Sequence, residues 1–167
     1  MEIWDILDRQ GDLTGKTIVR GEELKEEEYH LVVHIWIMNS KGEFLIQKRS
    51  EVVKIMPGMW AATGGSVIAG EDSKTAALRE VKEELGIDIN GDNLMKIERV
   101  LRKHNFGDVW LIKENVNLED LELLEEEVSD ARWMTKDEIK TMIHRGEFHD
   151  YGVDYFRNLY EHAQSLM

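Results

Sequence analysis

The sequence predicts an α/β domain in which strands and helices follow one another along the chain. Three observations support this fold class. Runs of β-branched and aromatic residues recur between turn-forming residues, longer segments carry apolar residues at helical spacing, and 42% of the 167 residues are apolar. A chain of this length and composition can build one hydrophobic core. Because it contains a single proline, Pro57, and no Gly/Ser-rich linker, we expect one domain over residues 1–167.

The predicted strands are recognised by their residue types. Residues 30–38, with the sequence HLVVHIWIM, are strongly apolar and are expected to form a buried central strand. The turn-forming residues 39–42 then return the chain into a second strand. In chain order, the expected strands are residues 2–7, 30–38, 43–48, 95–102, 107–113 and 130–134.

Helices are expected in three segments. Residues 74–85 have apolar side chains at helical spacing, and the following Gly86 allows the positive φ with which many helices end. Two further amphipathic segments, residues 136–145 and 151–165, complete the set.

Charge and composition restrict the class of partner. A formal net charge of −13 gives the chain no basic footprint for nucleic acid, and it disfavours an anionic membrane surface. Two interpretations of the acidity remain open, namely solubility and the gathering of carboxylates around a cation. The absence of cysteine excludes disulfides, thiolate metal sites and a cysteine nucleophile. No signal peptide or membrane span is recognisable, so we expect a cytoplasmic protein.

The helix predicted at residues 74–85 carries three glutamates on one face. With Glu80 taken as zero, Glu84 lies at about 40° and Glu83 at about −60°, because each helical residue advances by about 100°. Like charges at this spacing destabilise a helix by about 0.2–0.5 kcal/mol per pair. A divalent cation removes the repulsion, and an all-oxygen ligand set favours Mg²⁺ over zinc. The alternative is a solvated acidic face, which is common on helices.

Two glycines, Gly64 and Gly65, precede this helix. Because glycine has no Cβ, the backbone there can approach a metal ion closely enough for a carbonyl oxygen to bind it. Mg²⁺ usually keeps several waters and takes further ligands from substrate phosphates. The segment therefore predicts a site for a metal ion and a diphosphate.

Residues 65–87 are identified as a Nudix box. The pattern is Gly, five residues, Glu, seven residues, then Arg-Glu-aliphatic-any-Glu-Glu-any-Gly-aliphatic, and the chain matches all nine specified positions. The resemblance implies an α/β/α sandwich with a mixed central β-sheet, and a hydrolase that cleaves a diphosphate linkage. The matching residues are Gly65, Glu71, Arg79, Glu80, Val81, Glu83, Glu84, Gly86 and Ile87.

The resemblance also implies a metal site. By position, Gly65 would bind Mg²⁺ through its carbonyl, and Glu80, Glu83 and Glu84 would bind it through their carboxylates, with Mn²⁺ as a substitute ion. Such an ion polarises the phosphoryl group and lowers the pKa of a water that attacks phosphorus.

Four residues are expected to be catalytic on the same grounds: Glu83, Glu80, Arg79 and Glu71. Arg79 would orient the glutamates through charge-assisted hydrogen bonds, and Glu71 would pair with it or support the metal ligands.

The general base is left open at this point, because family members differ. It is a glutamate of the box or an acid from a later loop. The candidates in that loop are Glu125, Glu126 and Glu127, for each of which a solvated acidic run is an equally good interpretation.

Outside the box, the chain resembles isopentenyl-diphosphate isomerase and the hydrolases related to it, over roughly residues 2–87. The isomerase is therefore the alternative function. Isomerases carry a cysteine after their Pro-Gly-x-Trp motif and bind metal with several histidines, whereas this chain has Thr-Gly-Gly at 63–65 and only His30 near such a position. Hydrolysis is favoured. The matching segments are residues 2–8, 29–31, 47–49 and 56–60, with weaker similarity at Glu127-Val128 and Trp133.

Lys48, Arg49 and Lys54 are the expected substrate-binding residues. They lie at or just after the end of a strand, and basic residues there contact the diphosphate in the isomerase-like branch. Lysine supplies a point charge and arginine a bidentate fork. Ordinary surface bases are the alternative, above all for Lys54. Trp60 could stack on a nucleobase, but an aromatic residue beside Pro-Gly more often belongs to the core.

The expected activity is hydrolysis of a nucleoside diphosphate derivative, a small-molecule diphosphate, to a monophosphate and the remaining phosphorylated group. By analogy with the branch, nucleoside di- or triphosphates are preferred over sugar nucleotides. A ligand-binding module on the same scaffold is disfavoured because no box glutamate is lost. Nudix enzymes are often dimers, so a homodimer is considered, although no interface is legible in the sequence. The box does not specify the substrate.

Overall fold

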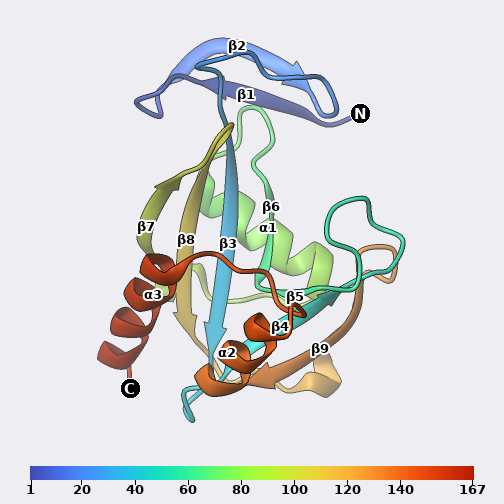
Figure 1. The fold of residues 1–167 in the computed structure, drawn as a ribbon, viewed down its shortest axis with the longest axis vertical. Coiled ribbons are helices and arrows are strands. Elements are labelled where there is room, and N and C mark those ends of the chain that lie inside the picture. The colour runs from blue at the N-terminus through green and yellow to red at the C-terminus, as the bar shows by residue number, and fades with distance from the viewer.

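A mixed β-sheet of seven strands forms the centre of the computed structural model, which describes residues 1–167 (Figure 1). Its strands are β3 (His30–Met38), β4 (Phe44–Arg49), β5 (Trp60–Ala61), β6 (Thr63–Ser66), β7 (Met95–Leu101), β8 (Asn105–Lys113) and β9 (Val128–Met134). A separate hairpin contains β1 (Ile3–Leu7) and β2 (Leu13–Val19). The helices are α1 (Ser73–Leu85), α2 (Lys136–His144) and α3 (Val153–Ser165), with 3-10 turns at Gly91–Asn93 and Leu118–Asp120.

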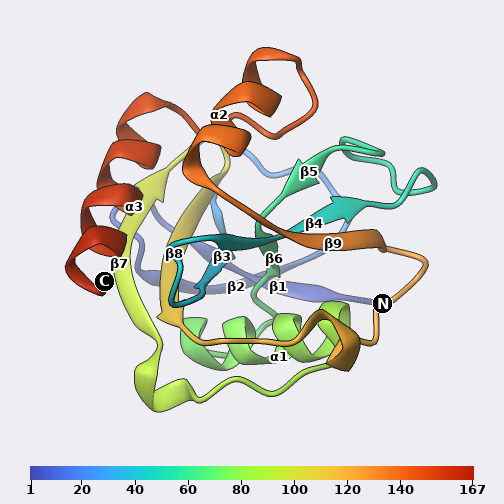
Figure 2. The same ribbon diagram turned by 90° about the horizontal axis from the view of Figure 1, so that it is seen from below.

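Helix α1 covers one face of the sheet, and α2 and α3 cover the other (Figure 2). Side chains alternate along β3, because successive residues of a strand point to opposite faces. Val33 and Ile35 therefore pack in the core that contains α1, whereas Trp36 and Met38 pack in the core that contains α2 and α3. The predicted α/β class, with a mixed sheet between helical layers, is confirmed.

The sheet splits between its neighbouring strands β3 and β4. The main path is β5-β4-β3-β8-β7, and β3 runs parallel to β8 over its whole length. By contrast, β3 and β4 pair only where Met38 meets Phe44. Beyond that point the two strands separate, so that β6 pairs with β3 and β9 pairs with β4. Strand β6 leads directly into the loop that precedes α1.

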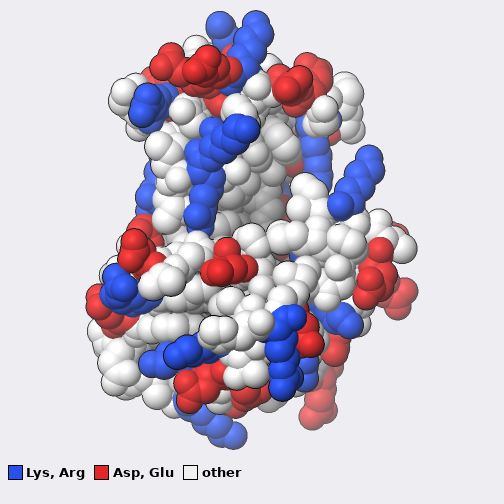
Figure 3. All heavy atoms as spheres, in the orientation of Figure 1, with Lys and Arg blue, Asp and Glu red and all other residues white.

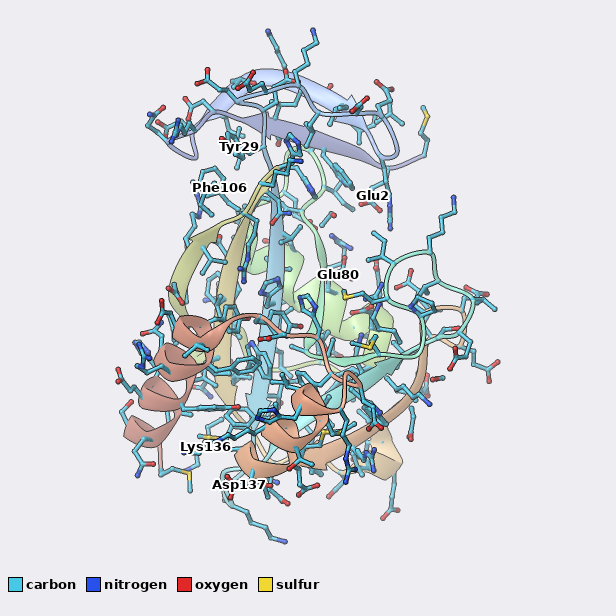
Figure 4. The ribbon with its side chains drawn as sticks, viewed as in Figure 1. Glu2, Tyr29, Glu80, Phe106, Lys136 and Asp137 are labelled. Carbon is cyan, nitrogen blue, oxygen red and sulfur yellow. The ribbon has the colours of Figure 1, made fainter.

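The hairpin β1–β2 lies at one end of the molecule, beyond the ends of β3 and β8 (Figure 1). Leu7 bridges to Tyr29, and both pack against Phe106; Figure 4 labels these two aromatic residues beneath the hairpin. Trp4 stacks on His30 with ring centroids 4.0 Å apart. The hairpin is thus attached by aromatic packing together with backbone hydrogen bonds, such as those between Leu7 and Tyr29.

The predicted elements are all present, with ends shifted by up to two residues. Three strands were missed. In β2 the residues from Leu13 to Thr17 are exposed, so no apolar alternation marks the strand. Strands β5 and β6 are only two and four residues long, and β6 contains Gly64 and Gly65, which have low strand propensity. None of the helices is long and apolar enough to cross a membrane.

Candidate active site

The rotation of α1 about its axis is fixed by its caps and its apolar side chains. Asp72 caps the first turn by accepting a hydrogen bond from the backbone N–H of Thr75 at 2.7 Å. Gly86 ends the helix with φ of 73°, a conformation that glycine adopts without strain. Val81 and Leu85 are buried against the sheet. Because the apolar stripe faces inward, the glutamates at its border are drawn in with it.

Two of the box glutamates are buried against the backbone of β6. Glu80 and Glu84 are 8% and 4% exposed. A side chain on Gly65 would occupy the space of the Glu80 carboxylate, and Glu84 accepts a hydrogen bond from the N–H of Gly64 at 3.2 Å. The two glycines therefore let the strand approach both carboxylates. Figure 4 shows Glu80 beside β6, between the hairpin and the loop of residues 50–59.

Arg79 holds the acidic groups in a fixed arrangement. Its Nε and Nη2 donate to both oxygens of Glu71, at 2.8 and 2.9 Å. Its Nη1 donates to Glu80 at 3.0 Å and to Glu83 at 3.2 Å, and its Nη2 also donates to the carbonyl of Ser66 at 3.0 Å. Burial alone would raise the pKa of Glu71. Its hydrogen bonds to Arg79 and to a backbone N–H outweigh this effect, so the pKa lies below its ordinary value. Glu71 is therefore a fixed anion that anchors the arginine fork.

The buried carboxylates carry charge at a cost. Burial raises the pKa of Glu80 to about 7, although Arg79 opposes the shift. Burial, together with the charges of Glu80 and Glu127, raises the pKa of Glu84 well above its ordinary value. No basic side chain forms an ion pair with Glu84. A hard divalent cation would stabilise these anions, and carboxylate and carbonyl oxygens are the donors it prefers.

These oxygens are brought together without forming a complete metal-binding set. No group of three acidic or histidine side chains is already arranged to hold an ion. Instead, Arg79 turns Glu80 and Glu83 towards itself, and the Glu83 side chain is 51% exposed. The donor types and the glycine backbone at Gly65 nevertheless fit a magnesium-like ion.

The loop before β9 adds a further carboxylate. The N–H of Leu124 donates to the carbonyl of Glu84 at 3.2 Å, and the carbonyl of Glu127 accepts from the N–H of Ser50 at 2.8 Å. Glu127 is the member of the acidic run 125–127 whose charge raises the pKa of both buried box glutamates. Its neighbours Glu125 and Glu126 are exposed. Glu127 is exposed as well, so it differs from these two neighbours only in the effect of its charge on Glu80 and Glu84.

Only some of the basic residues expected to bind substrate lie near the Nudix box. Lys48 and Arg49 end β4, half-buried, and Arg49 pairs in register with Val128, next to Glu127. The Nε of Arg49 donates to the carbonyl of Ile55 at 2.8 Å and so holds the loop of residues 50–59. Lys54 lies exposed in that loop, and no ion pair connects it to the box.

Trp60 belongs to the core. Its side chain is buried among residues of α2 and α3, and the guanidinium carbon of Arg132 lies 4.3 Å from its ring centroid. The ring is therefore covered on a face that a nucleobase would need.

Comparison with known proteins identifies the family. A model described as the NUDIX domain matches residues 28–153. The chain belongs to the Nudix family. A Nudix hydrolase of Listeria monocytogenes is 45% identical over 152 residues, which cover 90% of each chain. Nudix hydrolase 3 of Arabidopsis thaliana is 31% identical over 85% of this chain and 20% of its own length.

Comparison with solved structures confirms the fold. DR0079 from Deinococcus radiodurans superposes with a TM-score of 0.77 over 98% of both chains, at 23% identity. The chain is a Nudix hydrolase, and its family membership supports hydrolysis of a pyrophosphate linkage with a divalent metal ion. The isomerase alternative is not supported, since the relatives are named as hydrolases.

Proposed function

We propose that this Nudix hydrolase is a Mg²⁺-dependent enzyme that cleaves nucleoside diphosphate derivatives by attack of water on phosphorus. The environment of Glu84 is the main support for this proposal. This residue is buried, it has no basic partner, and it lies beside Glu80 and Glu127. A buried anion without a counter-ion is strongly destabilising. A divalent cation at this position accounts for its retention.

The residues of the box divide the work of holding the ion. Glu80, Glu83, Glu84 and the carbonyl of Gly65 would bind Mg²⁺, with Mn²⁺ as a substitute. A bound cation supplies polarisation of the phosphoryl group and neutralises developing charge. The fork of Arg79 sets the orientation of Glu80 and Glu83 before the ion arrives, because its donors already contact both side chains.

The general base is assigned to Glu127. Two carboxylates remain accessible at the site, those of Glu83 and Glu127. Glu83 is engaged by Arg79 at 3.2 Å, whereas Glu127 forms no ion pair. An accessible carboxylate that no basic side chain engages, next to the buried acids, is the better acceptor for a proton from the attacking water.

The substrate is assigned at the level of chemical class. Lys48, Arg49 and Lys54 are proposed to bind the diphosphate, and Arg49 is the best placed because it lies next to the Glu127 loop. At the level of fold, the NUDIX domain of Shewanella oneidensis NrtR, solved with ADP ribose, superposes with a TM-score of 0.60 at 14% identity. ADP ribose is itself a nucleoside diphosphate derivative.

Further parts of the proposal concern the setting of the enzyme. We propose a single domain over residues 1–167, of the isomerase-like branch but without its cysteine. It acts in the cytoplasm on small molecules and not on nucleic acid, and the homodimer stays a prediction that measurement of the molar mass in solution can check.

A panel of nucleotides tests the proposed function. Purified protein with Mg²⁺ is expected to release phosphate or a monophosphate from at least one nucleoside di- or triphosphate. Glu83→Gln and Glu84→Gln are each expected to lower that rate by orders of magnitude. Glu84→Gln should also weaken Mg²⁺ binding in calorimetry while unfolding at an equal or higher temperature, because it removes a buried charge. Full activity in both variants would contradict the metal assignment.

The assignment of the base is tested separately, and the chain provides a matched control. Glu127→Gln is expected to lower kcat by about 10²–10⁴-fold, the usual contribution of a general base. Glu126→Gln removes the same charge from the adjacent, exposed residue and should leave kcat unchanged. Equal effects of the two substitutions would show that only the charge of the loop matters.

A further inference from the structure

The surface of the molecule is hollowed below the hairpin (Figure 3), where Figure 1 shows the half of β3 nearer the hairpin. Residues of β3 with even numbers face this side, as the packing of Trp36 and Met38 against α2 and α3 shows. By the same alternation, Val32 and His34 face the hollow. In the backbone register His34 lies opposite Gly64, directly before Gly65, so this part of β3 runs beside the proposed metal ligand Gly65.

A chain of hydrogen bonds determines which nitrogen of His34 carries its proton. The indole N–H of Trp36 donates to the hydroxyl of Tyr155 at 2.9 Å, and that hydroxyl lies 2.8 Å from Nδ1 of His34. Indole can only donate, so the hydroxyl oxygen accepts from Trp36. Tyr155 is buried, and Nδ1 of His34 is the acceptor within reach of its own proton. Leaving that proton unpaired would cost free energy. His34 is therefore the tautomer with hydrogen on Nε2.

Several observations leave this Nε2–H available to a ligand. It has no hydrogen-bond partner in the protein, and it is not among the unpaired atoms sealed from solvent. The side chain of His34 is partly exposed. Burial, helped by the charge of Arg102, lowers the pKa of His34 to about 3, so the ring is neutral at physiological pH.

The strand beside His34 leaves space for its ring. A Cβ at Gly107 of β8 would lie 3.2 Å from Cε1 of His34 and 3.1 Å from Val100. Gly107 has ordinary strand geometry, so its φ does not require glycine. Glycine in the interior of a strand weakens it and often marks a close approach. Here it gives the imidazole room to keep its position.

We propose that the Nε2–H of His34 is a specificity-determining donor, which recognises an uncharged acceptor on the group attached to the diphosphate. The acceptor is a carbonyl oxygen or an unprotonated ring nitrogen of a nucleobase. A neutral donor favours binding of such an uncharged acceptor. Unlike a charged imidazolium, it would not strengthen the binding of an additional phosphate group. This inference rests on the proposed function, because it assumes that the substrate is a nucleotide. Tyr155 acts as a positioning residue, since it fixes the tautomer without contacting the substrate.

The tautomer is tested first, and this measurement needs no substrate. Two-bond ¹H–¹⁵N correlation spectra of the wild type at pH 7 are compared with those of His34→Gln, whose missing signals identify His34. We expect the pattern of a neutral imidazole with hydrogen on Nε2. A ring with hydrogen on Nδ1, or a charged ring, would overturn the proposal.

The recognition is tested by calorimetry with Mg²⁺ and the α,β-methylene analogues of ADP, CDP, GDP and UDP, which are not hydrolysed between the bridged phosphates. For the analogue that binds most tightly, His34→Phe is expected to raise Kd about tenfold, as for one lost hydrogen bond. His34→Gln should largely restore affinity, because its amide nitrogen can occupy the place of Nε2. Tyr155→Phe is expected to have an intermediate effect. Its control is Tyr151→Phe, which removes a buried hydroxyl bonded to the N–H of Ala62 and leaves the tautomer unchanged.

The probes separate the possible failures. Inorganic pyrophosphate has no base, so His34→Phe should bind it like the wild type, and an equal loss would reduce His34 to a structural role. Unchanged affinity of His34→Phe for an analogue that the wild type binds would overturn the role of His34 alone. Binding of none of the four analogues would overturn both this inference and the proposed nucleotide substrate.

Discussion

Replacing Gly86 by alanine is expected to lower both stability and catalytic rate because the added Cβ would collide with Glu122. A second glycine, Gly146, serves as a control for the effect of backbone conformation. Gly86 ends α1 with φ of 73°, and a Cβ there would lie 2.6 Å from the Cβ of Glu122 and 2.7 Å from its carbonyl oxygen. Gly146 follows α2 with the same φ of 73°, but a Cβ there meets nothing within 4 Å. The two sites differ in steric contact and share the backbone conformation.

The magnitudes follow from these two terms. Left-handed backbone costs an L-residue about 1–2 kcal/mol, so Gly146→Ala should lower the free energy of unfolding by about that amount. Gly86→Ala adds the displacement of Glu122, whose nearest atoms belong to or adjoin the backbone. Forcing an extra carbon into a packed site costs about 1–3 kcal/mol more. At roughly 2–4 °C per kcal/mol for a chain of this length, the two midpoints should be clearly separated.

Thermal unfolding, followed by circular dichroism, measures both variants against the wild type. The loop that contains Glu122 also carries Glu127, so kcat should fall in Gly86→Ala and stay unchanged in Gly146→Ala. Equal losses of stability in the two variants would refute the steric argument and leave only the strain of positive φ.

Two further predictions concern stability. Asp108 is completely buried and bonded to Arg99 at 2.6 and 2.9 Å, so Asp108→Asn should cost about 2–3 kcal/mol in urea unfolding. Burial alone would raise the pKa of Asp108. The hydrogen bonds and charge of Arg99 outweigh this effect, so the pKa lies below its ordinary value of about 3.9. This contribution is therefore complete above that pH and lost below it, and the difference between variant and wild type should shrink in acid. Thr135→Ala removes the capping box that Thr135 forms with Glu138 and should cost about 1 kcal/mol, seen as a lower melting temperature.

Much of the fold could be predicted because the signals were local. The ends of α1 followed from Gly86 and the apolar spacing, and β3 followed from its β-branched and aromatic residues. The hairpin strand β2 could not be predicted, because it is exposed along most of its length and pairs with β1 alone. Its place depends on contacts such as the stacking of Trp4 on His30, which bring distant residues together.

The candidate site shows the same division. Helical spacing was sufficient to place Glu80 and Glu84 on the border of the buried face, where the structure has them. Nothing in three successive glutamates could single out Glu127, since its position depends on the pairing of β9 with β4. The environment of His34 was equally hidden, because the residue that fixes its proton, Tyr155, is far away in the sequence.

The parallel pairing of β3 with β8 has a consequence for how the protein folds. It joins His30 to Asn105, and the segment between them contains β6, α1 and every residue of the box. Closing a loop of this length costs about 4 kcal/mol of chain entropy, and sheets built from such distant partners form slowly. The buried acids of α1 gain their neighbours only once that closure has occurred. The chain must therefore complete its most non-local step before its catalytic centre can exist, and no early folding species should bind the metal ion as the native protein does.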